Sequence, residues 1–406
     1  MIHKISTYSI YFSDLRKKIG LWGAIKYCTK KLATRKLESS PLSAKPDPVD
    51  FYSFIYSIPF GNAPHSMNKK TINWVIPDFG IGSGGHLNIF RVIKNLEELG
   101  FECRINIDGP SHFAKGEEAR ACIREHFFPI EATVSIGRDG LLPAAATFAT
   151  SWTTAYTVRD YLGAGKRYYF VQDFEPFFYA QGSDYSFAEE TYNFGFKGIT
   201  AGGWLAKKLS NEYQMETVPF NFSFDRHLYK PYPRRETEVQ RVFYYARPVT
   251  PRRAFELGLL TLAKIHENNP KVEFILAGWD TSAYHIPFPH LNAGVLPLNE
   301  LPDLYSQCDI ALVLSLTNAS LLPLEVMACG CAVVSNMGEN IEWLLNKDIA
   351  RFSKSTPDAL GDSILSLLNN PDELDELKTK GLEYARLTSW DTEVQKIAKT
   401  ITNDLI

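Results

Sequence analysis

The sequence has no apolar stretch long enough to cross a bilayer, for which a helix needs about 20 consecutive apolar residues. Its first residues lack an apolar segment followed by a cleavage site, so we expect no secretory signal peptide. The six cysteines show no paired metal-ligand spacing, and reduced cytosolic thiols are the simplest account of them. These absences predict a cytoplasmic protein.

A strong charge imbalance is also missing. The net charge of −3 gives no reason to expect nucleic acid as a partner. At 406 residues, 45% hydrophobic and 22% charged, the chain is long enough to bury two cores of ordinary size. We therefore expect two domains.

Residues 1–70 differ from the rest and are predicted to form a helical extension with a linker. Residues 15–37 contain eight Lys and Arg and no acid, interleaved with apolar side chains and Trp22. Such a basic amphipathic helix can lie on an anionic membrane surface, at its inner face, or pack as a solvated helix on its own domain. Both interpretations stay open. The prolines of residues 39–50 predict a linker.

From Thr71 onward, short apolar runs of strand length alternate with helical stretches. The predicted strands are 72–77, 103–107, 133–136, 146–149, 167–171 and 198–201, followed after a proline-rich hinge at 218–235 by 241–245 and 272–277. This alternation predicts an α/β chain with doubly wound parallel sheets. The loops at the carboxyl ends of the strands should then face a common cleft.

The glycine-rich string DFGIGSGGH (78–86) follows the first predicted strand, and a helix is expected from about 87 to 100. Gly84 and Gly85 permit close backbone approach to a ligand, although the spacing is not that of a dinucleotide fingerprint. His86 is either a site residue or a histidine that caps the helix.

Two further loops carry polar and aromatic side chains. The string SWTTAY (151–156) offers Trp152 and Thr153, which can stack against and hydrogen-bond a sugar. The string QDFEPFF (172–178) offers Asp173 and Glu175, which can orient an acceptor hydroxyl or act as a base. For Asp173, a turn or cap role ahead of Pro176 is the alternative.

Residues 309–343 form one predicted strand, turn, helix and strand unit. The apolar run 310–316 reads as a buried strand, Ser320 as the helix N-cap, and Gly330 as the end of the helix before a strand at 332–334. A helix N-terminus in such a loop suits a phosphate or diphosphate. Glu325, about one turn into the helix, can face the ligand or simply complement the helix dipole.

The string LPLEVMACGCAVVS (322–335) resembles the PPLEAMACGTPVV segment of family 4 of the glycosyltransferases, retaining enzymes of the GT-B fold that use nucleotide sugars. The resemblance implies an acceptor domain at 71–225, completed by a last helix at 389–406, and a donor domain at 236–388. It also implies that Glu325 accepts hydrogen bonds from the ribose hydroxyls of the donor.

The family places a second glutamate eight positions earlier, beside the transferred sugar, and this chain has Thr317 there. The departure suggests a different donor sugar, such as a deoxy sugar, or lost catalysis. The resemblance assigns the loop that follows to the donor site, namely Asn318, Ala319, Ser320 and Leu321.

The string ARPVTPRR (246–253) resembles the family's basic pair that neutralises the donor diphosphate. Arg247 matches the first member; the second is Arg252 or Arg253, with Arg252 preferred. Cations there would stabilise the charge that develops on the leaving group. Because no Asp-x-Asp pair occurs at a strand end, we expect neither a metal nor another cofactor.

The region that resembles the family's base-binding loops contains Gly278, Val295 and Leu296. The strings at 78–86 and 172–178 are most similar to bacterial rhamnosyltransferases of surface-glycan assembly.

The combined hypothesis is a retaining glycosyltransferase that moves L-rhamnose from dTDP-L-rhamnose to a growing, lipid-linked or free, surface glycan. Asp173, His86 and Arg247 are its predicted catalytic residues. Gly84, Gly85, Trp152, Thr153 and Glu175 are predicted to bind the acceptor. A non-catalytic GT-B subunit that binds nucleotide or carbohydrate is the main alternative, because of Thr317. A GT-B sugar-nucleotide epimerase is a weaker one, because the several in-line acids it needs cannot be placed.

Overall fold

The computed structural model describes residues 47–63, 68–235 and 238–405. The chain divides into a unit that ends at Tyr56 and a compact unit that begins at Ser57. In the first unit, the short helix α2 (Pro48–Phe51) is capped by Asp47, whose carboxylate accepts the N–H of Val49, and a 3-10 turn η1 (Ser53–Ile55) follows. The predicted basic segment 15–37 lies outside the described residues, as does most of the predicted linker.

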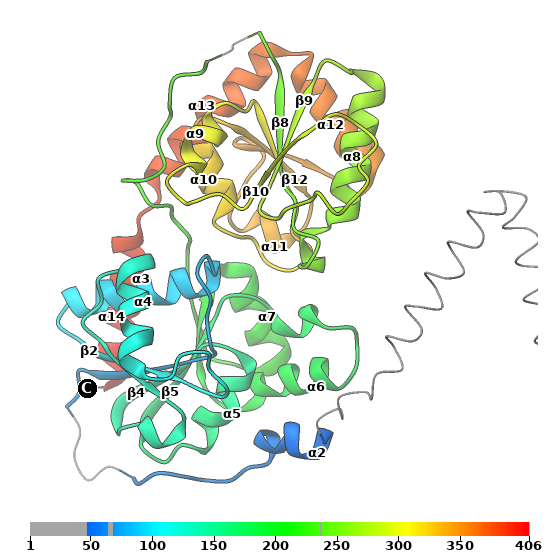
Figure 1. Cartoon of the computed structure of the whole chain (residues 1–406). Helices are drawn as coiled ribbons and strands as arrows, with labels where there is room; N and C mark the ends of the chain where they lie inside the picture. The colour runs from blue at the N-terminus through cyan, green and yellow to red at the C-terminus, as the bar shows by residue number, and fades with distance from the viewer. Residues whose placement is uncertain (1–46, 64–67, 236–237, 406) are drawn as a thin grey trace, which may run out of the picture. The chain divides into compact units, whose positions relative to one another are not determined.

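The compact unit contains two parallel sheets (Figure 1). The first sheet has seven strands, β1 (Thr71–Ile76), β2 (Glu102–Ile107), β3 (Thr133–Ile136), β4 (Ala144–Ala149), β5 (Ala164–Val171), β6 (Lys197–Ala201) and β7 (Thr217–Phe220). They pair in the order β3-β2-β1-β4-β5-β6-β7, and we call the part of the chain built on them the first domain. The order of the first six is that of a doubly wound Rossmann sheet.

The positions of the strands follow from their sequences. TINWVI of β1 and AAATFA of β4 are buried along their whole length, which suits central strands covered on both faces. TVPF of β7 carries Pro219, which cannot donate to a ladder and therefore belongs at an edge. Trp74, Phe148 and Tyr168 stack across β1, β4 and β5 with ring centroids 4.4 and 4.6 Å apart. These rings form the centre of the first core.

The helices of the first domain are α3 (Gly84–Glu98), α4 (Gly116–His126), α5 (Trp152–Asp160), α6 (Ser183–Glu190) and α7 (Gly203–Tyr213), with 3-10 turns η2 (Arg138–Gly140), η3 (Glu175–Phe178) and η4 (Thr191–Asn193). Ser151 and Thr154 form a capping box at the start of α5. This cap fixes the point at which the chain leaves the carboxyl end of β4.

The second sheet has six parallel strands, β8 (Arg241–Tyr245), β9 (Glu273–Ala277), β10 (Leu291–Gly294), β11 (Ile310–Val313), β12 (Ala332–Asn336) and β13 (Ala350–Ser353). Their order, β10-β9-β8-β11-β12-β13, repeats the Rossmann order and defines the second domain. Its helices are α8 (Phe255–Asn268), α9 (Leu301–Ser306), α10 (Leu322–Ala328), α11 (Glu339–Glu342), α12 (Pro357–Leu368) and α13 (Pro371–Leu387), with a 3-10 turn η5 (Pro251–Arg253).

The last helix, α14 (Trp390–Leu405), packs against α3 and β7 of the first domain (Figure 1). Glu393 accepts the N–H of Asn221 at 2.9 Å, and Asp404 accepts the hydroxyl of Tyr168 at 2.8 Å. At the other end of the compact unit, Phe60 forms an isolated bridge with Tyr161. Segments from both ends of this unit thus contact the first domain, while the predicted domain boundaries remain a prediction.

The prediction of two doubly wound parallel sheets is confirmed. Several details were wrong. The strand predicted at 310–316 ends at Val313, and Leu316 is exposed, while α3 begins at Gly84 rather than near Leu87. The strands β7, β10 and β13 were not predicted, and β7 takes up the first residues of the predicted hinge at 218–235. Ser320 is not an N-cap, because α10 begins at Leu322 after Leu321, whose side chain cannot cap.

No helix in the described residues combines the length and the apolar content needed to span a bilayer. The five cysteines of the described ranges are unpaired thiols, and Cys28 lies outside those ranges.

Candidate functional site

The carboxyl edges of the two sheets are joined by hydrogen bonds between the loop after β11 and the loop after β5. The hydroxyl of Thr317 donates to Asp173 Oδ2 at 2.7 Å. The amide nitrogen of Asn318 donates to the carbonyl oxygens of Gln172 (2.9 Å) and Ala201 (3.0 Å). Its amide oxygen accepts the indole N–H of Trp343 at 2.7 Å. Asn318 is therefore a bridge between the domains, and both ends of its amide are already in use.

Three arginines follow β8 and form what we call the arginine cluster: Arg247, Arg252 and Arg253. Arg247 donates to the hydroxyl of Tyr245 at 3.0 Å. Arg252 lies over the ring of Phe178, 4.2 Å from its centroid, and its Nε is 3.8 Å from Asp173 Oδ2. Burial, and then the neighbouring charge of Arg252, lower the pKa of Arg253. Both candidates for the second member of the predicted basic pair, Arg252 and Arg253, thus lie in this cluster.

The arginine cluster carries more positive charge than its surroundings balance. Asp173 faces Arg252 and Arg253, and the charge of Arg252 also acts on Glu175, whose pKa burial raises to about 7. Within the described chain, the Nε of Arg252 is buried and has no hydrogen-bond partner. Buried cations are stable when they are paired, and guanidinium groups match phosphate geometry. The cluster is therefore suited to an anion such as a diphosphate.

Asp173 is held from both domains. Its Oδ1 accepts the N–H of Phe174 at 2.9 Å, while its Oδ2 accepts from Thr317. Only 13% of its side chain is exposed. Burial raises the pKa of Asp173, and the hydrogen bond from Thr317 together with the charges of Arg252 and Arg253 opposes that rise. The carboxylate is thus kept beside the cluster at the junction of the two sheets.

Glu325 lies in α10 and faces side chains of the other domain and of the connection between the domains. Burial raises the pKa of Glu325 to about 7, against the opposing effects of Arg91 and of a hydrogen bond from the Tyr229 hydroxyl. Arg91, on α3, stacks on the rings of Phe128 (5.2 Å) and Trp390 (4.8 Å). In the described chain, Nη1 of Arg91 has no partner. Glu325 therefore sits in a buried polar group that spans the two domains.

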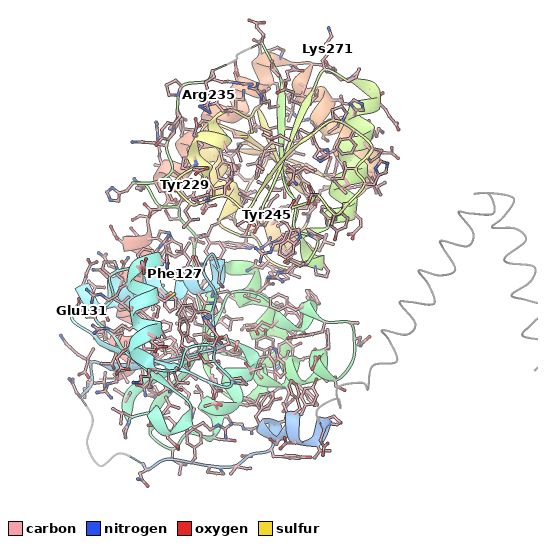
Figure 2. All side chains as sticks on the ribbon, viewed as in Figure 1. Phe127, Glu131, Tyr229, Arg235, Tyr245 and Lys271 are labelled. Carbon is pink, nitrogen blue, oxygen red and sulfur yellow. The ribbon has the colours of Figure 1, made fainter. Side chains whose placement is uncertain are left out.

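The side chains of Tyr229 and Tyr245 lie toward one end of the second domain, whereas Lys271 lies toward its opposite end (Figure 2). Gly278 has a φ of +102°, and a Cβ added there would lie 2.3 Å from the ring of Tyr245. Its N–H donates to the carbonyl oxygen of Gly294 at 2.7 Å. Gly278 is thus required by the close approach of Tyr245, which in turn holds Arg247.

Of the two other residues predicted to bind the base, Val295 has 74% of its side chain exposed and Leu296 is half-buried. Both follow the carboxyl end of β10. Ala319 is buried and its N–H donates to the carbonyl oxygen of Asn340 at 3.0 Å, while Leu321 is buried at the start of α10. An exposed apolar side chain at this edge is available to a ligand, whereas Ala319 and Leu321 shape the loop.

The residues predicted around His86 lie in α3 rather than in a glycine-rich turn. Gly84 and Gly85 form the first helical turn, and the carbonyl oxygen of Gly85 accepts from Gln172 at 3.0 Å. The ring nitrogens of His86 contact the Ser83 hydroxyl (2.8 Å) and the Pro77 carbonyl (3.3 Å). Burial lowers the pKa of His86 to about 4. The ring is therefore neutral at pH 7, with both nitrogens engaged.

Trp152 and Glu175 form a buried scaffold behind Asp173. The side chain of Trp152 is 7% exposed, and its indole N–H donates to the Tyr179 hydroxyl at 2.9 Å. Glu175 accepts the backbone N–H of Trp152 (2.9 Å) and the hydroxyl of Tyr169 (3.0 Å). Burial raises the pKa of Glu175 to about 7. Trp152 is therefore packed within the first domain, and its predicted contact with a sugar stays a prediction.

Thr153, the remaining predicted acceptor residue, is half-buried and its hydroxyl lies 3.0 Å from that of Ser151. Sequence reasoning missed Arg91, Tyr229 and the contact between Thr317 and Asp173. A signal existed for Arg91, since it interrupts the apolar stretch Ile89, Phe90, Val92 and Ile93 of α3. The described ranges contain no group of three His, Cys, Asp or Glu side chains that could hold a metal ion.

A cavity of about 590 Å³ lies away from this junction, at the amino ends of β5, β6 and β7. Lys197 of its lining lies 2.7 Å from Glu216 and 2.8 Å from Asp404, and Arg167 donates to the backbone carbonyl oxygens of Val158 and Tyr161. It is a polar recess of the first domain in which both lining acids pair with a lysine.

Both a family model and a curated protein are similar in sequence to this chain. Residues 240–365 match the model of the family described as WsaF, C-terminal domain. The chain is 35% identical over 345 residues to the O-antigen biosynthesis protein RfbC of Myxococcus xanthus, a match that covers 82% of this chain. The chain spans 27% of the length of that relative.

Solved structures of low sequence identity share the whole two-domain arrangement. HepE of Anabaena in complex with UDP-glucose matches with a TM-score of 0.62 at 16% identity, over 82% of this chain and 99% of that one. TarM of S. aureus (TM-score 0.66, 7% identity) and the sucrose-phosphate synthase of Thermosynechococcus elongatus (0.61, 12%) each match over 82% of this chain, and over 100% and 98% of theirs. The chain therefore has the GT-B fold, with a second domain similar to the C-terminal domain of the WsaF family.

Proposed function

We propose that this chain is a glycosyltransferase that takes a sugar from a nucleotide-sugar donor and adds it to a growing surface glycan. The observation that carries the proposal is the arginine cluster, three half-buried arginines of which Arg252 has a buried Nε without a hydrogen-bond partner in the described chain. The diphosphate of a nucleotide sugar supplies the missing negative charge. Two of the similar proteins support the proposal: one is an O-antigen biosynthesis protein, and the structure of the other was solved in complex with UDP-glucose.

In this proposal the second domain binds the nucleotide. Arg247, Arg252 and Arg253 hold the diphosphate and stabilise the charge that develops on it as the bond to the sugar breaks. Glu325 accepts the ribose hydroxyls, for which an acceptor-only carboxylate is suited. Because burial raises the pKa of Glu325 to about 7, bound ribose would favour its ionised form by hydrogen bonding to it.

We further propose that transfer proceeds with retention, so that the leaving phosphate accepts the proton of the incoming hydroxyl on the same face of the sugar. Two of the predicted bases of the first domain are engaged elsewhere, which supports this route: His86 contacts Ser83 and Pro77, and Glu175 accepts the backbone N–H of Trp152. Analysis of the product anomer tests the stereochemistry, and an inverted product would contradict it.

L-Rhamnose from dTDP-L-rhamnose is the donor that we propose. It rests on the resemblance of residues 78–86 and 172–178 to rhamnosyltransferases, and on Thr317 in place of the family's glutamate, a departure that suggests a different donor sugar such as a deoxy sugar. The alternative is a GT-B subunit that binds nucleotide or carbohydrate without catalysis, which Thr317 also favours.

A thermal-shift series with dTDP, UDP and GDP tests donor binding. A ligand that binds only the folded protein at 100 times its Kd stabilises it by about 2.7 kcal/mol. We expect dTDP to raise the melting temperature most. Release of L-rhamnose or its transfer from dTDP-L-rhamnose would then identify an enzyme, whereas binding without turnover would identify the non-catalytic alternative. No stabilisation by any of the three nucleotides would contradict the proposed function.

A further inference from the structure

Asp173 differs from the other buried acids of the first domain in that its carboxylate is fixed from both domains. Phe174 of its own loop donates to Oδ1, and Thr317 of the second domain donates to Oδ2. The neighbouring residues repeat the pattern, since Asn318 donates to the carbonyl oxygen of Gln172. Two consecutive residues of one domain thus bind two consecutive residues of the other. This pairing determines where the Asp173 carboxylate lies.

The carboxylate keeps capacity for a ligand. An ionised carboxylate has about four acceptor positions, and the protein donors named above occupy one on each oxygen. Arg252 Nε lies 3.8 Å from Oδ2, which is an ion-pair distance but too long for a hydrogen bond. The nearest cation therefore leaves the remaining lone pairs of Asp173 free to accept a hydroxyl.

The position of Asp173 relative to the arginine cluster defines what such a ligand would be. If the cluster holds a diphosphate, the next group along a nucleotide sugar is the sugar, attached directly to the outer phosphate. Asp173 is the acceptor that the first domain brings beside Arg252. A sugar is rich in hydroxyl donors, and a charged acceptor forms a stronger hydrogen bond with them than a neutral one.

We infer that Asp173 binds a hydroxyl of the transferred sugar, and that Thr317 is its positioning residue, acting from the other domain. This inference rests on the proposed function and gives Asp173 a donor-sugar role in place of the predicted acceptor role. The sugar is then recognised only where the two domains meet, while the nucleotide is bound by the second domain. Thr317 keeps the carboxylate in reach instead of contacting the sugar itself.

The first test separates the sugar from the nucleotide. Asp173→Ala is compared with the wild type for binding of dTDP and of dTDP-L-rhamnose by calorimetry, with UDP and UDP-glucose as a second pair of probes. A hydrogen bond to a charged group contributes about 1.5–3 kcal/mol, so affinity for the nucleotide sugar should fall about 10- to 100-fold. Affinity for the nucleoside diphosphate should not fall, because its partners are in the second domain and the variant removes a negative charge beside the arginine cluster.

The second test concerns Thr317. Thr317→Val removes the hydroxyl but keeps the shape, and should weaken nucleotide-sugar binding by about tenfold, whereas Thr317→Ser should keep it. Thr157→Val is the matched control, since the Thr157 hydroxyl donates to Asp108 at 2.6 Å with both residues in the first domain. The control removes a bond of the same kind and should leave the ratio of the two affinities unchanged.

The third test moves the carboxylate to the other side of the junction. In the double variant Asp173→Ala, Thr317→Glu, the glutamate extends from position 317 toward the space left by Asp173. It should recover about tenfold of the lost nucleotide-sugar affinity. Thr317→Glu alone should weaken binding, because two carboxylates would share the space.

Equal losses of dTDP and dTDP-L-rhamnose affinity in Asp173→Ala would overturn the inference while leaving the proposed function intact. So would no loss in that variant, or an unchanged affinity ratio in Thr317→Val. Failure of the wild type to bind any of the nucleotides would instead remove the proposed function, and the inference with it. The two failures are therefore distinguished by the wild-type measurement.

Discussion

The carboxyl edges of the two sheets share one strand order but differ in how their polar groups are used. At the first edge, Trp152 and Glu175 are buried, His86 is half-buried, and all three are hydrogen-bonded within the first domain. At the second edge, Arg252 and Arg253 are crowded together and one of their nitrogens has no partner in the described chain. The fold brings both sets of loops to a junction. The unbalanced positive charge of these arginines distinguishes the second edge as the one suited to bind an anion.

The largest expected effect comes from removing that charge. The double variant Arg247→Ala, Arg252→Ala should lower dTDP affinity by about 1,000-fold, since truncating one member of a buried charged pair typically costs 2–5 kcal/mol. Calorimetry measures the loss. Arg252→Lys should fall in between, because it keeps the charge but loses the planar contact with Phe178.

Arg120→Ala is the control for this experiment. Arg120 is a half-buried arginine of α4 that pairs with Glu131 at 3.5 Å, so its loss should leave nucleotide affinity unchanged. If Arg120→Ala lowered dTDP affinity as much as the double variant does, the arginine cluster would not be the nucleotide-binding site.

A smaller effect, about 3 kcal/mol in the free energy of unfolding, is expected where the two edges touch. Gly202 has a φ of +90°, and a Cβ there would lie 2.3 Å from the ring of Trp343. Gly202→Ala should therefore introduce both backbone strain and a clash between the domains. Chemical denaturation measures the change.

The adjacent Gly203 is a matched control. It lies in the first turn of α7, and a Cβ there would meet nothing within 4 Å. Gly203→Ala should therefore be neutral or stabilising by up to about 1 kcal/mol. If Gly202→Ala were equally harmless, the close contact with Trp343 would not hold the edges together.

The smallest effect, about 2 kcal/mol, concerns the buried scaffold of the first edge. Burial raises the pKa of Glu175 from 4.5 to about 7. The folded state thus binds a proton that the unfolded state releases between these values, so this contribution is full below pH 4.5 and is lost as the pH rises through 7. Glu175→Gln should remove it, and the variant should lose less stability than the wild type between pH 5 and pH 8.

Chemical denaturation of the wild type and of Glu175→Gln at several pH values measures this difference in the free energy of unfolding. His86 contributes with the opposite sign, since burial lowers its pKa from 6.5 to about 4 and its contribution is lost as the pH falls between these values. It is unchanged in Glu175→Gln, so the difference between variant and wild type isolates Glu175. A difference that stays constant with pH would contradict the buried, proton-binding role.

Much of the fold was predictable because the signals are local. Apolar runs of strand length identify β1, β4, β8 and β11, and each is buried. The strand β10 was missed because its sequence, LNAG, is neither apolar nor alternating, and it lies at the edge of the sheet. The start of α10 was misplaced because Ser320 was taken as its N-cap, whereas the residue directly before the helix is Leu321. A serine caps a helix only from that position.

The site was predictable to the extent that its residues are close in the sequence. The arginines after β8 occur within seven residues of one another and share a motif, so they could be proposed together. The partners Thr317 and Asp173 are 144 residues apart and belong to different domains. No periodicity relates such residues, and only the packing of one sheet edge against the other brings them into contact.

The return of α14 to the first domain sets an order of assembly. During synthesis the ribosome releases the strands of the first sheet well before Trp390 to Leu405, which follow the entire second domain. Until then, Arg91 lacks the indole on which it stacks, and β7 lacks the helix that packs against it. The half of the molecule that is made first is therefore the half that is finished last, and a nascent chain must keep that surface from misassociating while the other half folds.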